Sequence, residues 1–165
     1  MQTMLRQIVI ACYLIATTLG CFAETSEQKD HLFKITLPEG WRWNEQAGKI
    51  RISDPKNGNS ISIQFAPSRK LSSDEEKELL KKGNQEFIKR IVMPAKGTVI
   101  REEERQISGI HARQLTYLLS HGGAVGNVTY IALFNKGYAF TITFGGPEKN
   151  QVEAMKKSVE TLKFN

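Results

Sequence analysis

The sequence predicts an α+β protein in which two helices cover an antiparallel sheet, with elements in the order βββ-α-ββββ-α. Short segments with strand-like patterns follow one another through turns rich in glycine, proline and asparagine, which is typical of antiparallel sheets. Two longer segments repeat apolar residues at helical spacing. A chain of 165 residues with 40% hydrophobic residues suits one domain with its own core.

Three strands are expected in the first third of the chain, at residues 33–37, 49–53 and 60–65. Each alternates apolar and polar residues, the period of a strand with one buried face. Turn residues at 38–40 and 54–59 separate them, so we expect an antiparallel meander. Trp41 and Trp43 lie between the first two strands, with both indoles on one side if that segment is extended.

The first helix is predicted to begin near Ser73. Glu76 follows three residues later, which fits a capping box, and the neighbouring acidic residues suit the positive end of the helix dipole. An inner stripe is expected to contain Leu80, Phe87, Ile88 and Ile91. Pro94 is predicted to end the helix.

Four further strands are expected at residues 98–107, 110–120, 128–134 and 138–144. Residues 121–127 read as a flexible glycine-rich loop, and 128–134 is apolar on both faces, so it is predicted to be central and covered twice. The last helix is expected over about residues 147–162, with Pro147 in its first turn. Its inner stripe comprises Val152, Met155, Val159 and Leu162.

Residues 1–23 have the pattern of a secretory signal peptide. Arg6 is the only charge before Glu24, and the apolar run at 8–20 is shorter than the ~20 residues that span a bilayer. A buried N-terminal helix or a membrane anchor is the alternative. Cleavage after Ala23 is the favoured route, and lipidation at Cys21 is the other. Both routes predict an exported protein, periplasmic, secreted or membrane-anchored as a lipoprotein.

The expected domain organisation is a signal peptide at 1–23, a flexible arm at 24–30 and a single domain at 31–165. Both cysteines, Cys12 and Cys21, lie in the leader. The exported domain would therefore have no disulfide, no thiol nucleophile and no thiolate metal site. Its core must hold the fold alone.

Two motifs resemble those of bacterial Mog1/PsbP-like domains. Residues 33–41, Phe-Lys-Ile-Thr-Leu-Pro-Glu-Gly-Trp, are similar to the aromatic-x-aliphatic-x-Leu-Pro-x-Gly-Trp opening of that family. Residues 107–117 are similar to its mid-chain strand, and the segment 138–144 with the terminal helix completes the likeness over nearly all of 31–165. The resemblance implies an α/β/α sandwich around an antiparallel sheet. It also implies a non-catalytic role, since members include photosystem II accessory proteins, a partner of the Ran GTPase and bacterial envelope proteins.

Catalytic motifs are missing from the sequence. His31, His111 and His121 are not spaced as zinc ligands, and no serine lies in a nucleophile elbow. We therefore expect no catalytic residue, no metal site and no cofactor. The one loop with ligand-binding potential is His121-Gly122-Gly123, because the glycines let the backbone approach a ligand.

The formal charge of +6 is dispersed, and no aromatic residues punctuate a basic stripe, so nucleic acid is not an expected partner. Trp41, Arg42 and Trp43 form the best recognition motif, because indole is common at binding hot spots. The leading hypothesis is an exported, non-enzymatic binding or accessory module of the bacterial cell envelope, with an envelope protein as partner. The alternatives are a ligand carrier or enzyme using residues 121–127, and a lipoprotein that meets the membrane only through Cys21.

Overall fold

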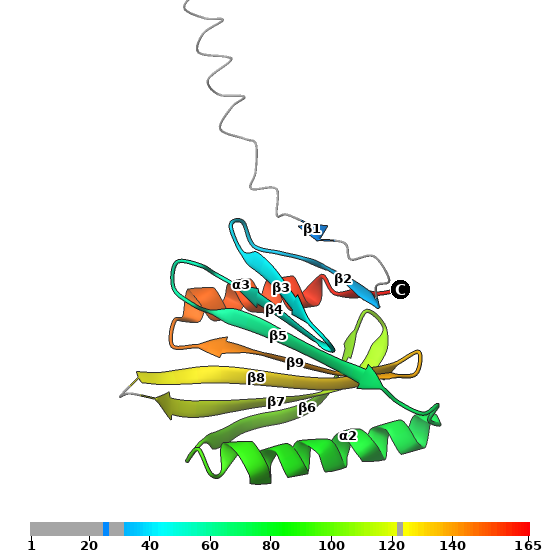
Figure 1. Cartoon of the computed structure of the whole chain (residues 1–165). Helices are drawn as coiled ribbons and strands as arrows, with labels where there is room; N and C mark the ends of the chain where they lie inside the picture. Colours follow the sequence, from blue (N-terminus) through cyan, green and yellow to red (C-terminus); the bar gives the residue numbers. More distant parts are fainter. Residues whose placement is uncertain (1–24, 27–31, 122–123) are drawn as a thin grey trace, which may run out of the picture.

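The main sheet has seven strands, in the order β3-β4-β5-β9-β8-β7-β6 (Figure 1). The computed structural model describes residues 25–26, 32–121 and 124–165. Every neighbouring pair in this sheet is antiparallel. The strands are β3 (Arg42–Gln46), β4 (Lys49–Ser53), β5 (Ser60–Pro67), β6 (Thr98–Ile107), β7 (Ile110–His121), β8 (Ala124–Asn135) and β9 (Tyr138–Gly146).

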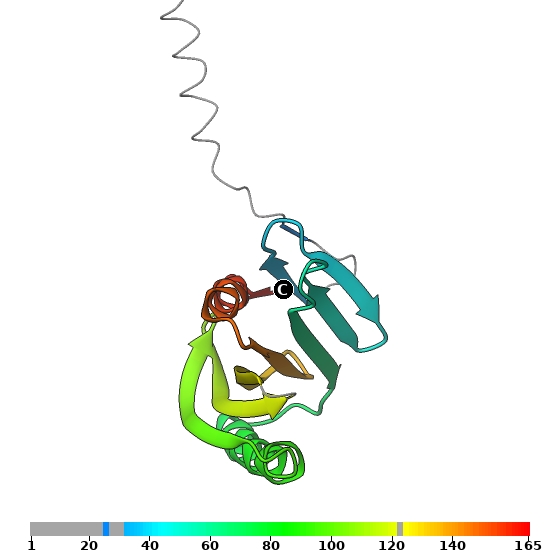
Figure 2. The same ribbon diagram turned by 90° about the vertical axis from the view of Figure 1, so that its left-hand side faces the viewer.

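Two helices and a smaller sheet cover the main sheet. Helix α2 (Ser73–Phe87), extended by the π-helical turn η1 (Ile88–Val92), packs on β7 and β8. Helix α3 (Lys149–Glu160) packs on β9 and on the smaller sheet, whose strands are β1 (Thr25–Ser26), β2 (Phe33–Thr36) and β10 (Lys163–Phe164). Figure 2 shows β8 and β9 between the two helices, the layering of an α/β/α sandwich.

The larger core lies between the main sheet and the layer formed by α3 and the smaller sheet. Strands β4, β5 and β9 each bury every second residue there, because alternate side chains of a strand share one face. Helix α3 contributes Met155 and Val159, and Leu162 follows just after its end. Phe33 on β2 and Phe140 on β9 are the largest fully buried side chains.

A smaller core lies under α2. Its buried members are Leu80, Val92, Leu115, Tyr117, Tyr130 and Ala132, and Phe87 stacks on Tyr130 with 4.0 Å between ring centroids. Strand β8 therefore contributes Ile131 to one core and Tyr130 to the other. This confirms that the segment 128–134 is covered on both faces.

The prediction that residues 33–37 form the first strand of the meander is wrong. Residues 33–36 form β2, which pairs with β1 and β10 in the smaller sheet, and β3 takes its place beside β4. The turn at 38–41 is closed by the Trp41 N–H donating to the Pro38 carbonyl at 3.2 Å. Strand β3 was missed because Arg42–Gln46 carries only one apolar residue, whereas backbone pairing with β4 is what stabilises it.

The N-terminal end of α2 differs from the prediction by one residue. Ser72, not Ser73, is the cap, and its hydroxyl accepts from the Glu75 N–H at 3.3 Å. The Ser72 N–H in turn donates to the Glu75 carboxylate at 2.8 Å, so Ser72 and Glu75 form the capping box. Arg69 pairs with the same carboxylate at 2.7 Å.

The Glu75 carboxylate is expected to make α2 sensitive to acid. The hydrogen bond from the Ser72 backbone, followed by Arg69, lowers the pKa of Glu75 from 4.5 to about 2. A lowered pKa in the folded state gives stability that is present above about 4.5 and is lost as pH falls through about 2. Glu75→Gln keeps an acceptor without the charge, so the urea midpoints of wild type and variant should differ above pH 4.5 and converge near pH 2. Glu160→Gln is the control variant. A difference in urea midpoint between wild type and Glu75→Gln that stayed constant at every pH would contradict this expectation.

The end of the first helix also departs from the simple periodicity. The predicted inner residue Ile91 is 48% exposed, whereas Val92 is fully buried. The π-helical turn is responsible, because the Met93 N–H donates to the Ile88 carbonyl, five residues back, at 2.9 Å. This wider turn moves the inner position one residue along the chain. Leu80 is buried, and Phe87 and Ile88 pack against the same core, as predicted.

Two further boundaries are corrected. Pro147 precedes the cap residue Glu148 of α3 and does not lie in the first turn. The seven-residue loop predicted at 121–127 is much shorter, because β7 continues to His121 and β8 begins at Ala124. Glycine at 126 is compatible with the strand because its missing Cβ leaves room for the Gly146 backbone.

Candidate functional site

One half of the main sheet has a face that no helix covers. Helix α2 packs on β7 and β8, and β3, β4, β5 and β9 carry no described element on that side (Figures 1 and 2). We call this surface the open face. Strand alternation and pairing register assign it Arg42, Asn44, Gln46, Lys49, Arg51, Ser53, Ser60, Ser62, Gln64, Thr141, Thr143 and Gly145.

The open face is cationic. It contains Arg42, Lys49 and Arg51, all exposed, and no aspartate or glutamate. None of these three side chains makes an ion pair among the described residues, whereas Arg69, Arg90, Arg101 and Arg113 all do. Three unneutralised cations on one surface give it a positive potential that attracts anionic groups.

The three cations are close enough to act together. Lys49 and Arg51 are two residues apart on β4, which places them about 7 Å apart along the strand. Arg42 pairs with Ser53, so it lies diagonally from Arg51 at about 7–8 Å. Such spacing matches neighbouring carboxylates or phosphates on a partner surface.

Uncharged hydrogen-bonding groups continue the surface beside the cations. Arg51 pairs with Ser62, and Ser62 pairs with Thr143, so these residues form one row across β4, β5 and β9. The Ser62 hydroxyl is buried and has no hydrogen-bond partner among the described residues. The open face therefore offers exposed cations on β3 and β4, which suits recognition of an anionic surface, whereas the buried Ser62 hydroxyl is not accessible from solvent.

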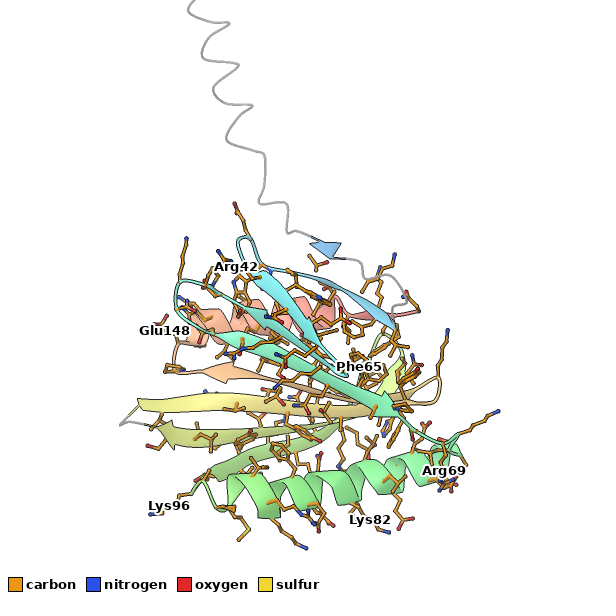
Figure 3. All side chains as sticks on the ribbon, viewed as in Figure 1. Arg42, Phe65, Arg69, Lys82, Lys96 and Glu148 are labelled. Carbon is orange, nitrogen blue, oxygen red and sulfur yellow. The ribbon has the colours of Figure 1, made fainter. Side chains whose placement is uncertain are left out.

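The predicted Trp-Arg-Trp motif is divided between two surfaces. Trp41 is only 9% exposed and belongs to the larger core. Trp43 is half-buried against the same core, with its ring centroid 6.2 Å from that of Phe33. Arg42 is exposed on β3 and lies on the open face (Figure 3). Arg42 is therefore the member of the motif that is exposed on the open face.

The other predicted site residues lie wholly or partly outside the described structure. Gly122 and Gly123 are not among the described residues, and neither are Cys21 and His31. His121 is the last residue of β7, and its side chain is likewise outside what the structure describes. His111 is half-buried in β7, where its backbone position pairs with Gln106.

A second polar cluster lies between α2 and the β6–β7 pair. Glu102 accepts from Arg113 Nε at 2.8 Å and from Asn84 Nδ2 at 3.1 Å, and Arg113 also reaches Glu104 at 3.3 Å. Burial opposes ionisation of Glu102, but these hydrogen bonds outweigh it and hold its pKa below the ordinary value. The ion pairs of this cluster join β6 to β7, and the hydrogen bond from Asn84 to Glu102 attaches α2 to the sheet.

The shifted pKa values have structural causes of this kind. Burial raises the pKa of Tyr117 to about 12 and also raises the pKa of Tyr130, because the charged phenolate is disfavoured in the smaller core. A hydrogen bond from Lys82 lowers the pKa of Glu78.

In the described part of the chain, no group of three or more His, Cys, Asp or Glu could hold a metal ion.

Sequence reasoning missed the open face because the face depends on pairing. The polar positions of β4 and β5 are visible as alternation, but nothing local indicates that β9 lies beside β5 or that β3 is a strand. The only signal available was the charge pattern: the outward positions of β4 are Lys49, Arg51 and Ser53, with no acid among them.

Several solved structures share the fold of this chain at low sequence identity. The chain is similar to cyanobacterial PsbP (CyanoP) from Synechocystis sp. PCC 6803, with a TM-score of 0.65 and 13% identity over 90% of this chain and 96% of that one. It is also similar to LpqN, described as involved in cell envelope biogenesis of Mycobacterium tuberculosis, with a TM-score of 0.53 and 12% identity over 89% and 87% of the two chains. A Pseudomonas aeruginosa protein of unknown function matches with a TM-score of 0.52 and 11% identity over 87% and 97%.

These similarities establish the fold. The chain has the α+β Mog1/PsbP-like fold that its motifs predicted. No family model matches the sequence, and no curated protein matches it. Neither helix in the described segments is long and apolar enough to cross a bilayer.

Proposed function

We propose that this protein is an exported, non-enzymatic accessory module of the bacterial cell envelope, and that it binds an acidic surface of a partner protein through the open face. The observation that carries the binding mode is the set of three unpaired cations on that face, Arg42, Lys49 and Arg51. The leader pattern at residues 1–23 supports export. The fold shared with PsbP and LpqN supports an accessory role.

Charge complementarity favours an acidic protein partner. Exposed charges contribute to orientation and association rate, and each exposed ion pair contributes about 0.5 kcal/mol to affinity. Removing three such pairs is therefore expected to weaken binding about tenfold. The exposed amide side chains beside the cations, Asn44, Gln46 and Gln64, suit the rim-like polar contacts of a reversible complex.

The test is a photo-crosslinker placed at Asn44, which is exposed on the open face between these cations. In the producing cell, wild type should give a defined protein adduct. The triple variant Arg42→Gln, Lys49→Gln, Arg51→Gln should reduce that adduct about tenfold. A triple variant on α3, Lys149→Gln, Lys156→Gln, Lys157→Gln, removes the same charge from exposed positions on another surface and should leave the adduct unchanged.

Two results would contradict the proposal. One is the absence of any adduct from Asn44 when the protein is produced at its natural level. The other is an equal loss of adduct in both triple variants, because that would mean that net charge, and not the open face, determines binding. Circular dichroism and urea midpoints close to wild type would verify that each variant is folded.

The mature N-terminus separates the two processing routes. Mass spectrometry of the protein purified from the cell should find Glu24 as the first residue if cleavage follows Ala23. A lipid-modified Cys21 would instead make the module a membrane-anchored lipoprotein. Retention of Met1 would contradict both processing routes.

A further inference from the structure

The C-terminal end of the α2–η1 helix and the start of β6 form an exposed apolar projection. Four large hydrophobic residues are exposed within residues 91–100: Ile91 by 48%, Met93 by 64%, Val99 by 39% and Ile100 by 55%. We call this segment the apolar tip. Figure 3 shows Lys96, within it, extending away from the body of the molecule at the end of α2.

The tip is a rigid turn, held by contacts on both sides. Val92 is fully buried in the core under α2, and the Gly97 N–H donates to its carbonyl at 2.8 Å. A Cβ at Gly97 would meet Val92 Cγ1 at 2.8 Å and the Leu118 carbonyl at 2.9 Å, so the turn lies directly against β7. The π-helical turn fixes Val92 inward, and Ile91 and Met93 on either side of it face solvent.

Cations surround these apolar residues. The segment 89–101 contains Lys89, Arg90, Lys96 and Arg101 and no acidic residue. Glu86 pairs with both Lys89 and Arg90, and Glu103 pairs with Arg101. Lys96 has no ion pair among the described residues, and it lies within the turn with a φ of 54°. Four cations with two partner carboxylates leave the tip positive.

We propose that the apolar tip docks on the surface of an anionic lipid bilayer. The tip combines four exposed apolar side chains with an excess of positive charge, on a turn at the end of the α2–η1 helix. The headgroup region of a bilayer receives such side chains, while lysine and arginine beside them meet lipid phosphates. Charge complementarity thus selects an anionic membrane as the occupant.

This docking is independent of the proposed function. The tip is continuous with β6 at one edge of the main sheet, and the open face extends to β3 at the other edge. Both surfaces can be occupied at once. An open-face variant should therefore bind lipid normally, and a tip variant should keep its adduct from Asn44, which makes failure of one proposal distinguishable from failure of the other.

The first test is sedimentation of the protein, as purified from the producing cell, with phosphatidylcholine vesicles that contain or lack phosphatidylglycerol. Wild type should bind the phosphatidylglycerol vesicles at least tenfold more tightly. Lys96→Gln should weaken that binding about fivefold, the effect of one cation near an anionic surface. The double variant Met93→Ser, Ile100→Ser should weaken it at least tenfold, because it removes the two most exposed apolar side chains of the tip.

Leu79→Ser is the matched control, since Leu79 is a 41% exposed apolar residue on α2 outside the tip. It should bind vesicles like wild type. A second measurement uses Met93→Trp, whose emission should shift to the blue with phosphatidylglycerol vesicles, while Leu79→Trp should show no shift. Three results would each overturn the proposal. Wild type would fail to bind these vesicles, the tip double variant would bind them as tightly as wild type, or Leu79→Ser would lose as much vesicle binding as the tip double variant. A protein adduct from position 93 without vesicle binding would overturn it in favour of a protein partner.

Discussion

Replacing Phe140 with alanine is expected to lower the free energy of unfolding by about 3–5 kcal/mol. Phe140 is 2% exposed on β9, and its ring lies 5.0 Å from Phe164, 6.2 Å from Phe33 and 6.0 Å from Phe65 between centroids. It therefore joins the main sheet to the smaller sheet. Truncation leaves a cavity that neighbouring rings on three different strands cannot fill together.

Urea unfolding of Phe140→Ala measures this loss, with an unchanged dependence on urea concentration to show that the unfolding transition is the same. Phe140→Leu is the matched variant, and it should recover much of the loss because it retains most of the apolar volume. A loss below about 1 kcal/mol for alanine would mean that the two sheets are not joined through this ring.

Replacing Gly145 with alanine is also expected to lower the free energy of unfolding, by about 1–3 kcal/mol. Gly145 on β9 faces Val128 on β8, and an added Cβ would collide with the Asn127 carbonyl oxygen and lie 2.6 Å from Val128 Cα. Both obstacles are backbone, so they move only if the β8–β9 ladder opens. Glycine is thus required here for close approach of two strands.

Gly83→Ala is the control because Gly83 lies within α2 and an added Cβ meets nothing within 4 Å. That variant should be stabilised by about 0.5–1 kcal/mol, since alanine is favoured over glycine in a helix interior. Thermal unfolding of both variants checks the opposite signs. Destabilisation of both to the same extent would mean that backbone entropy, and not steric contact, dominates at Gly145.

The sequence predicted this fold where local pattern and tertiary packing agree. The alternation in β5 and β9, and the spacing of Met155 and Val159 in α3, correspond directly to buried faces. Prediction failed where long-range pairing decides the structure. Residues 33–36 pair with the C-terminal β10, and no local pattern contains that information.

The candidate site was predictable only in part. Arg42 was singled out with its tryptophan neighbours, but the tryptophans are packing residues and the arginine belongs to a surface shared with Lys49 and Arg51. The apolar tip was hidden by a change of helical period. A regular helix of 3.6 residues per turn would place Ile91 in the core. The wider π-helical turn places Val92 there instead.

The pairing of β2 with β10 also dictates when the protein can finish folding. Residues 33–36 emerge early during synthesis, but their partners Lys163 and Phe164 emerge more than 120 residues later. The Thr36 N–H likewise donates a hydrogen bond to the Thr161 hydroxyl, at 2.8 Å, and this bond can form only after Thr161 has been synthesised. The smaller sheet, and with it one cover of the larger core, therefore closes only after translation of these last residues. A chain passing through a membrane in an extended form would remain incompletely folded until its C-terminal segment has crossed.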